Sequence, residues 1–287
     1  MKTKHLRLMQ RAYVILFFCF MYLPIAYMVV FSFNQSKGYA LFTGFTFKWY
    51  TSLLHNESIL HALWVSLYLA LFSAVIATVL GTAASLGIAS MGRKSRLLVT
   101  NITYITTVNP EIITGISLMM LFVAYQRFAS ELDFLPDNIM GFPTLLIAHI
   151  TFNIPYVILS VGPKLRQMDR NLIDAAQDLG CTWMQAFWKV IIPEIKPGIV
   201  SGALTAFTMS IDDFIISYFT AGTSSSTLAM TIYGMTKKRV SPEINAVSTL
   251  LFVTVIILLA IAFAFPLYWI LTGSFKTQIS INSTTPE

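Results

Sequence analysis

The chain has 287 residues, of which 56% are hydrophobic and only 11% are charged. Soluble globular domains carry roughly a quarter charged residues, so this composition excludes an ordinary soluble fold. The formal net charge of +6 is therefore evidence about which side of a membrane each loop faces. No basic patch interleaved with aromatic residues predicts binding to nucleic acid.

The N-terminal part predicts a membrane span that is kept in the mature protein. Residues 1–11 are basic, and residues 12–33 form an apolar run that contains Pro24. A run of about 20 apolar residues crosses the hydrocarbon core of a bilayer. A secretory signal peptide has a shorter apolar core of about 7–15 residues, followed by a small-residue cleavage site. We therefore expect a first transmembrane helix here.

Further apolar runs follow along the chain. They cover about residues 63–91, 98–126, 142–162, 198–221 and 246–272. The run at 63–91 is rich in small residues, which let membrane helices approach closely. The run at 98–126 is interrupted by Asn109-Pro110-Glu111. With the first span, these runs predict an all-α membrane protein with six transmembrane helices in one domain over residues 1–287.

A long polar segment with a helical pattern, residues 163–197, separates the fourth and fifth runs. One face of the first predicted helix is apolar and the opposite face is polar; the apolar positions are Leu172, Ala175, Ala176 and Leu179, and the polar ones Asn171, Asp174, Gln177 and Asp178. Gly180 follows, where a helix favours a left-handed end. We expect the apolar face to pack on the protein's own spans.

A second short helix is predicted after this glycine. Thr182 stands three residues before Gln185, which is the spacing of a capping box. The helix would carry Trp183 and end before Pro193. The turn between the two helices would be free to dock into another protein. An amphipathic loop lying on lipid headgroups is the alternative interpretation.

The distribution of basic residues predicts the orientation. With the N-terminus in the cytoplasm, the cytoplasmic segments hold 13 of the 19 Lys and Arg residues. Cytoplasmic loops of membrane proteins are enriched in these residues. Six spans then place both termini and the segment 163–197 in the cytoplasm, with the run Lys237-Lys238-Arg239 as the exception.

Three acidic residues, Glu111, Asp212 and Asp213, lie within apolar runs. A charge at the middle of a bilayer costs roughly 2.5–3.5 kcal/mol, so such residues usually face a bundle interior or a water-filled path. Asp212 lies about 21 Å into its span and Glu111 about 18–20 Å, at 1.5 Å per residue. Two acidic spans at one level predict a pathway for a cation.

Each acidic residue also has a structural interpretation. Asn109-Pro110-Glu111 is a good helix start, with asparagine as the cap and glutamate in the first turn. Asp212 and Asp213 point about 100° apart on a helix, so one can line the path while the other caps a helix or bonds to a neighbouring span. His149 is predicted to be a packed or hydrogen-bonded residue of a span rather than a metal ligand.

The segment 163–197 resembles the "EAA" loop of ABC-importer membrane subunits. The spacing matches throughout, and Asp174 replaces the usual glutamate, Val190 an isoleucine and Ile192 a leucine. In that family the loop forms the coupling helix that inserts into a cleft on the cytoplasmic ATPase. The resemblance implies that coupling depends on Asp174, Ala175, Ala176, Asp178 and Gly180.

Further phrases resemble the second (C-type) membrane subunit of spermidine/putrescine ABC importers. They occur in the family's order over nearly the whole chain and include Tyr22-Leu23-Pro24-Ile25, Phe47-Lys48-Trp49-Tyr50, Pro110-Glu111-Ile112-Ile113, Ser210-Ile211-Asp212-Asp213-Phe214 and Ser241-Pro242-Glu243-Ile244-Asn245. This resemblance implies a type I ABC importer permease fold (MetI-like) in the bacterial inner membrane. It also implies a homologous sister permease, two ATP-binding cassette subunits and an extracytoplasmic polyamine-binding protein as partners, besides membrane lipid.

The chain itself is not expected to be an enzyme. It has no GxxxxGK[ST] phosphate loop, so ATP and magnesium are expected on the partner ATPase subunits, with no cofactor or metal bound by this chain. Two alternatives stay open for its function. One is an ABC permease for another small cation, and the other is a self-sufficient channel or proton-coupled carrier with the acidic spans as a proton relay.

Overall fold

The computed structural model describes residues 2–37, 41–131, 140–169, 171–238, 242–254, 256–257, 260 and 264. Within these ranges the chain is almost entirely helical. The β-structure seen in them is one isolated antiparallel bridge between Asn34 and Phe45. The chain divides into two compact units. One comprises Glu57–Gly234, and the other combines Met1–Asn56 with Met235–Glu287.

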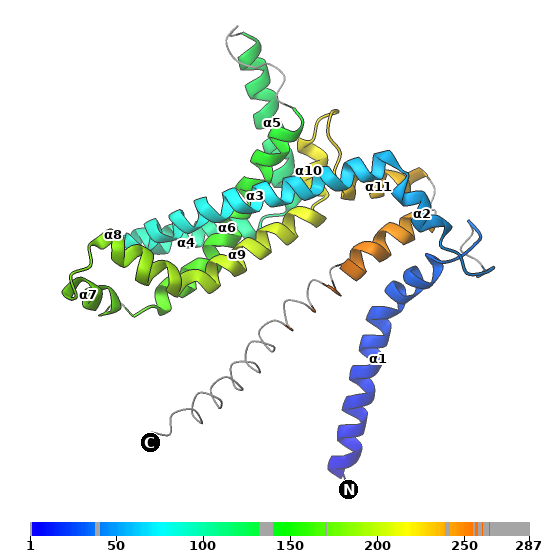
Figure 1. Ribbon diagram of the computed structural model, residues 1–287, viewed down its shortest axis with the longest axis horizontal. Helices are drawn as coiled ribbons and strands as arrows, with labels where there is room; N and C mark the ends of the chain where they lie inside the picture. Colours follow the sequence, from blue (N-terminus) through cyan, green and yellow to red (C-terminus); the bar gives the residue numbers. More distant parts are fainter. Residues whose placement is uncertain are drawn as a thin grey trace, which may run out of the picture. The chain divides into compact units, whose positions relative to one another are not determined.

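The unit Glu57–Gly234 is a bundle of long helices (Figure 1). In chain order its elements are α3 (Glu57–Ser90), α4 (Arg93–Val108), α5 (Glu111–Ser130), α6 (Phe142–Gln167), α7 (Asn171–Asp178), α8 (Trp183–Ala186), the π-helical turn η1 (Phe187–Ile191), α9 (Ile192–Asp212), α10 (Ile215–Thr220) and the start of α11 (Leu228–Lys238). Helices α3, α6 and α9 run alongside one another, and α5 leaves them at a steep angle. Helices α7 and α8 lie together at one end of the bundle.

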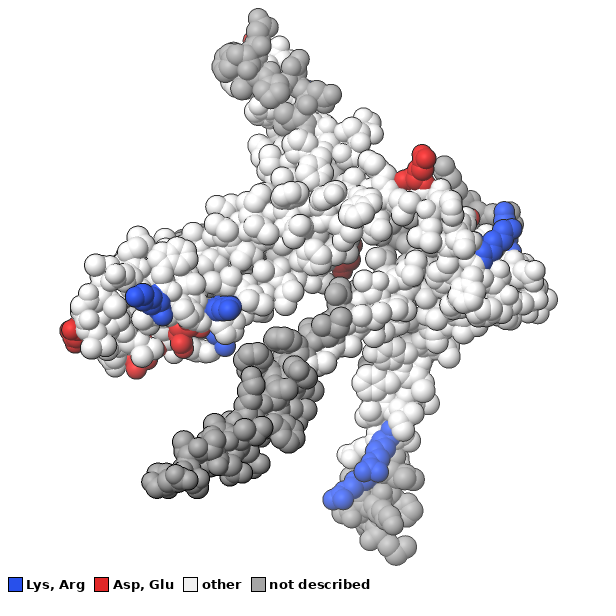
Figure 2. All heavy atoms as spheres, viewed as in Figure 1, with Lys and Arg blue, Asp and Glu red and all other residues white. Residues whose placement is uncertain are grey.

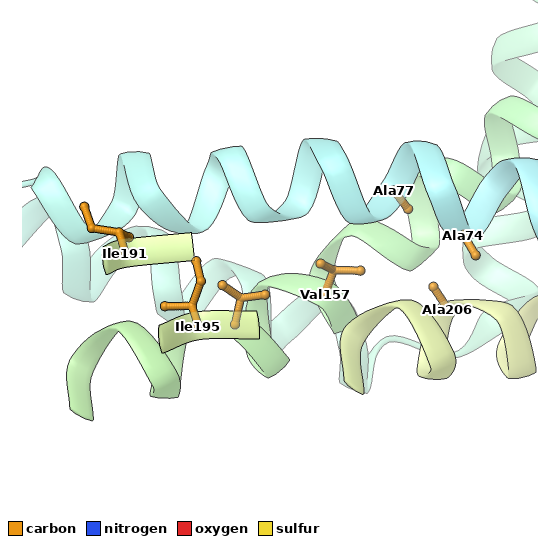
Figure 3. Packing of buried hydrophobic residues seen from close by; sticks show 7 residues of the cluster. Ala74, Ala77, Val157, Ile191, Ile195 and Ala206 are labelled. Atoms are coloured by element: carbon orange, nitrogen blue, oxygen red, sulfur yellow. The ribbon is translucent and has the colours of Figure 1, made fainter. Parts of the chain in front are cut away.

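Small side chains hold the three central helices close together. Figure 3 shows Ala74 and Ala77 of α3 facing Val157 of α6 and Ala206 of α9. A Cβ added at Gly81 of α3 would lie 2.7 Å from the Cβ of Val157, so only glycine fits there. Without a hydrophobic driving force inside lipid, close approach of this kind is what stabilises helix association.

Replacing Gly81 by valine is therefore expected to destabilise the fold. The added side chain overlaps Val157, and overpacking of this kind costs typically 1–3 kcal/mol. Gly87 lies on the same helix, and a Cβ added there meets nothing within 4 Å, so Gly87→Val is the matched control. Thermal unfolding of the two purified variants should show a lower melting temperature for Gly81→Val alone, and equal melting temperatures would contradict the close packing.

The described residues contain five helices that are long and apolar enough to cross a membrane. They are Met9–Phe31, Glu57–Ser90, Glu111–Ser130, Phe142–Gln167 and Trp183–Asp212. An all-α membrane protein is thereby confirmed. The expected sixth span at 246–272 lies mostly outside the described residues, although 242–254 are helical.

Two of the predicted apolar runs are each broken into two helices. The predicted interruption of residues 98–126 is confirmed, because α4 ends at Val108 and α5 begins at Glu111. The run 198–221 was expected to be continuous, and this expectation is wrong. Helix α9 ends at Asp212, and α10 begins at Ile215.

The prediction that the second helix of the segment 163–197 ends before Pro193 is also wrong. The chain stays helical from Trp183 to Asp212. The π-helical turn η1 lies directly before the proline and lets the helix continue past it. The Ile192 N–H bonds to the Phe187 carbonyl, five residues back, and Pro193 follows in the first turn of α9. Proline has no N–H for the hydrogen-bond ladder of a helix, and a single π-helical turn is the usual form in which π-helix occurs inside an α-helix.

The other unit contains α1 (Lys2–Phe31), α2 (Lys48–Leu54) and the helical residues 242–254. A compact turn follows α1 and is built around Asn34. Its side chain donates to the Leu41 carbonyl (3.0 Å) and accepts the Thr43 N–H (2.9 Å), while the Trp49 indole donates to its carbonyl (2.6 Å). This turn fixes where α1 ends and orients α2.

Candidate functional site

The break between α4 and α5 follows from Pro110. The residue before a proline is disfavoured in helical conformation, and Asn109 has an extended ψ of 133°. Asn109 was expected to be the cap of α5, but Pro110 occupies that position and Asn109 ends α4. The Asn109 side chain still contacts α5, because its Nδ2 donates to the Thr114 hydroxyl at 3.1 Å.

Glu111 opens onto a small pocket. The cavity has a volume of about 50 Å³, and its lining includes Glu111, Thr114, Phe152 and Tyr156. As the first residue of α5, the Glu111 carboxylate lies at the positive end of the helix dipole. A carboxylate beside two aromatic rings offers both an anionic acceptor and π faces, which together suit an ammonium group.

The break between α9 and α10 is held by Asp213. Its carboxylate accepts the N–H of Ile216 (3.2 Å) and of Ser217 (2.8 Å), as well as the Ser217 hydroxyl (2.8 Å). These bonds cap the start of α10, and only 9% of Asp213 is exposed. Asp213 thus has the capping role that the sequence left open between it and Asp212. Asp212, the last residue of α9, is exposed.

His149 of α6 joins the cap of α10 to a neighbouring span. Its Nε2 lies 3.0 Å from the Ser217 hydroxyl and 3.5 Å from the Asp213 carboxylate, and the ring is fully buried. Because the Ser217 hydroxyl donates to Asp213, Nε2 must carry the proton and donate to Ser217. The prediction that His149 is a hydrogen-bonded span residue is confirmed.

The two helix breaks meet. A Cβ added at Gly115 of α5 would lie 3.4 Å from the Ile216 Cα of α10, so these helices touch through their backbones. Ile216, whose N–H is bonded to Asp213, also lines the pocket of Glu111. The carboxylates of Glu111, Asp212 and Asp213 lie close enough to repel one another. The structure therefore brings together all three acidic residues that the sequence singled out.

A layer of buried polar side chains surrounds this junction and was missed by the sequence analysis. The Asn153 amide of α6 donates to the Ser210 hydroxyl of α9 (2.8 Å), which lies 2.9 Å from the Ser73 hydroxyl of α3. All three side chains are buried. The spacing of His149 and Asn153, one helical turn apart within an apolar run, is the sequence signal that could have revealed it.

Replacing Asp213 by alanine is expected to destabilise the protein by about 1–3 kcal/mol, because the buried Ser217 hydroxyl and two amides lose their acceptor. Asp212→Ala serves as the matched control, since Asp212 is one residue away and does not cap α10. Thermal unfolding in detergent should show a lower melting temperature for Asp213→Ala only. An equal fall in melting temperature for both variants would show that the hydrogen bonds of Asp213 to α10 do not add to the stability of the protein.

The turn after α7 has the geometry of a Schellman motif. Gly180 has a φ of +83°, its N–H bonds to the Gln177 carbonyl (2.9 Å), and the Cys181 N–H bonds to the Ala176 carbonyl (3.0 Å). This pairing satisfies the carbonyls at a helix end and favours glycine at the left-handed position. The predicted capping box is also confirmed: the Gln185 N–H donates to the Thr182 hydroxyl, and the Gln185 side chain accepts the Thr182 N–H.

The expected packing of the apolar face of α7 is wrong. Ile173, on the flank of this face, packs against the core of the bundle. Leu172 is 44% exposed and Leu179 is 86% exposed, and Ala175 is exposed as well. The helix is turned so that most of its apolar stripe faces outward. An exposed apolar surface of this kind on a helix marks a site of interaction.

Comparison with known proteins identifies the family. Residues 77–273 match the model described as a binding-protein-dependent transport system inner membrane component. The putrescine transport system permease protein PotI of Escherichia coli (strain K12) is 38% identical over 240 residues, covering 83% of each chain. The spermidine/putrescine transport system permease protein PotC of the same strain is 34% identical over 247 residues, covering 86% of this chain and 89% of the relative.

A solved structure shares the fold. A chain from the crystal structure of a bacterial ABC transporter involved in the import of the acidic polysaccharide alginate superposes with a TM-score of 0.67. The aligned part covers 90% of this chain and 95% of that chain, at 16% sequence identity. The expected ABC importer permease fold is thus confirmed. The chain belongs to the family of inner-membrane components of binding-protein-dependent transport systems.

Proposed function

We propose that this chain is a permease subunit of an ABC importer that carries polyamines such as putrescine and spermidine into the cell. The observation that carries the proposal is the cluster of three carboxylates at the meeting point of two broken helices. Among the described residues, the basic side chain within ion-pair distance of these carboxylates is His149, whose Nε2 lies 3.5 Å from the Asp213 carboxylate. An excess of negative charge inside a membrane domain favours a cationic solute, and relatives at 34–38% identity carry the names of putrescine and spermidine permeases.

The roles of the acidic residues differ in this proposal. Glu111 contacts a terminal ammonium group of the solute, with Tyr156 and Phe152 supplying aromatic faces. A pocket of about 50 Å³ has room for one such group, so a linear diamine would be held by one end at a time. Asp212 forms the next anionic contact along the pathway, and Asp213 positions α10 beside the pocket.

The coupling residues are Asp174, Ala175, Ala176, Asp178 and Gly180. The exposed apolar stripe of α7 and the exposed Leu179 support docking of this turn into a cleft on an ATPase. Two ATPase subunits with bound ATP and magnesium, a sister permease and an extracytoplasmic binding protein complete the transporter. The chain has six spans in this proposal, as one transmembrane permease domain over residues 1–287, and the distribution of basic residues supports cytoplasmic termini.

The proposal is tested by the ATPase activity of the reconstituted complex, measured with and without loaded binding protein across a panel of solutes. We expect stimulation by putrescine or spermidine. Stimulation by a different solute alone would keep the ABC importer and discard the polyamine substrate. Solute transport by the isolated chain in liposomes would instead favour a self-sufficient channel or carrier.

A further inference from the structure

A second cavity lies away from the acidic residues, where the C-terminal ends of α3 and α6 meet the N-terminal part of α4. Its volume is about 170 Å³, and its lining includes Arg96 of α4 and Arg166 of α6. Among the described residues, no Asp or Glu lines it. The cavity therefore places two cationic side chains together, and the described part of its wall has no acidic residue.

The two guanidinium groups have donors to spare. Arg96 uses Nε and Nη2 to bond the carbonyls of Ile88, Ala89 and Met91 at the end of α3. Within the described part of the chain, no bond is recorded for its Nη1. Arg166 likewise has no recorded hydrogen bond or ion pair to a described residue, and its side chain is exposed. Arg96 is thus fixed in place by its bonds to α3 while one edge of its guanidinium stays available.

Most of the remaining wall of the cavity is apolar, although Ser85 and Thr100 also line it. Ile88 of α3 and Ile158, Leu159 and Leu165 of α6 contribute to it. Charged side chains gather at the end of the bundle that carries α7 and α8, whereas the length of the bundle shows mostly uncharged surface (Figure 2). The cavity thus lies at the boundary between the apolar length of the spans and a charged end, with cations on one wall and hydrocarbon on the other.

We propose that this cavity binds the phosphate headgroup of an anionic phospholipid from the membrane leaflet on the side of α7 and α8. The guanidinium groups of Arg96 and Arg166 hold the phosphate, for which arginine is geometrically suited. The glycerol and the first acyl methylenes lie against the leucine and isoleucine side chains. Free inorganic phosphate has the same polar chemistry but leaves the apolar wall uncovered. The proposal is independent of which solute the protein carries.

The charge on Arg166 provides the first test. Full-length protein is incorporated into nanodiscs that contain equal amounts of phosphatidylglycerol and phosphatidylcholine, and the lipid retained after release is measured by native mass spectrometry. We expect the wild type to retain phosphatidylglycerol preferentially, and Arg166→Gln to weaken this retention about ten- to a hundred-fold, because the phosphate loses a charge-assisted hydrogen bond from the guanidinium. Arg93→Gln is the matched control, because Arg93 lies nearby at the start of α4 and does not line the cavity.

A second variant tests the cavity without changing charge. Gly162 lines it, and a Cβ added there meets nothing within 4 Å. Gly162→Leu is therefore expected to fill the space, leave folding intact and abolish the preference for phosphatidylglycerol. Gly87→Leu is the control, since Gly87 is also a helical glycine with open space but lies outside the cavity.

The outcomes separate the sources of the anion. Competition by inorganic phosphate at concentrations that leave bulk lipid binding unchanged would identify a free-anion site and overturn the lipid proposal. Equal retention of the two lipids, or equal losses in Arg166→Gln and Arg93→Gln, would overturn the site itself. Loss in Arg166→Gln and Gly162→Leu, with both controls unchanged, would establish it.

Discussion

Replacing Gly180 by proline is expected to abolish solute uptake while ATP hydrolysis by the assembled transporter continues. Gly180 has a φ of +83°, whereas proline fixes φ near −65° and has no N–H to give to the Gln177 carbonyl. A penalty of about 3 kcal/mol or more lowers the population of the native turn by more than about a hundred-fold. The exposed Leu179 would then no longer be presented to an ATPase in its native position.

The matched control is Gly92→Pro. Gly92 lies in another short turn, between α3 and α4, and its φ of −61° already suits proline. Uptake and ATPase rates are measured on the same reconstituted preparations. Gly180→Ala should give an intermediate loss, because a left-handed alanine costs only about 1–2 kcal/mol. Normal uptake by an assembled Gly180→Pro transporter would refute the role of this turn in coupling.

Neutralising Glu111 or Asp212 is expected to lower polyamine uptake about ten- to a hundred-fold. Each substitution, Glu111→Gln or Asp212→Asn, keeps the size of the side chain and removes one charge-assisted hydrogen bond to an ammonium group, worth about 1.5–3 kcal/mol. The binding protein still delivers solute in these variants. The loss should therefore appear in transport rather than in solute binding to the binding protein.

Glu131→Gln is the control for this series. Glu131 follows the last residue of the same helix, α5, and is exposed, so the change in charge is equal but remote from the junction. Uptake of radiolabelled putrescine and spermidine into proteoliposomes is the measurement. Unchanged polyamine transport in both Glu111→Gln and Asp212→Asn would remove the junction from the pathway and favour another solute.

The sequence predicted the parts of this protein that depend on local chemistry. Long apolar runs predicted the membrane spans, because a helix needs about 20 apolar residues to cross a bilayer. Pro110 predicted the break before α5, and Thr182 and Gln185 predicted the start of α8. Such predictions succeed because proline and capping residues affect the backbone only within three or four positions of themselves. The glycine stop at Gly180 followed from the same kind of local rule.

What the sequence could not predict depends on packing between distant segments. The outward rotation of α7 is set by Ile173 packing on the bundle, and the periodicity of α7 alone gave the opposite orientation. The break after Asp212 exists because Asp213 caps α10 and bonds with Ser217, which in turn contacts His149 on another helix. The layer of Ser73, Asn153 and Ser210 likewise joins three spans, and the spacing of His149 and Asn153 indicated only the part of it that lies on α6. Tertiary partners of this kind are invisible to single-segment patterns.

The continuous helix from Trp183 to Asp212 has a mechanical consequence. Thirty residues make a rod about 45 Å long, with the exposed turn at one end and the acidic junction at the other. If the rod rotated by only about 5° about its exposed end, its other end would move by about 4 Å over this length. A movement of this size is enough to open or close a passage the width of a methylene chain. We infer that this rod works as a lever. The distance between spin labels at positions 183 and 212 should therefore stay constant through the ATPase cycle. A change in that distance would show that the rod bends instead.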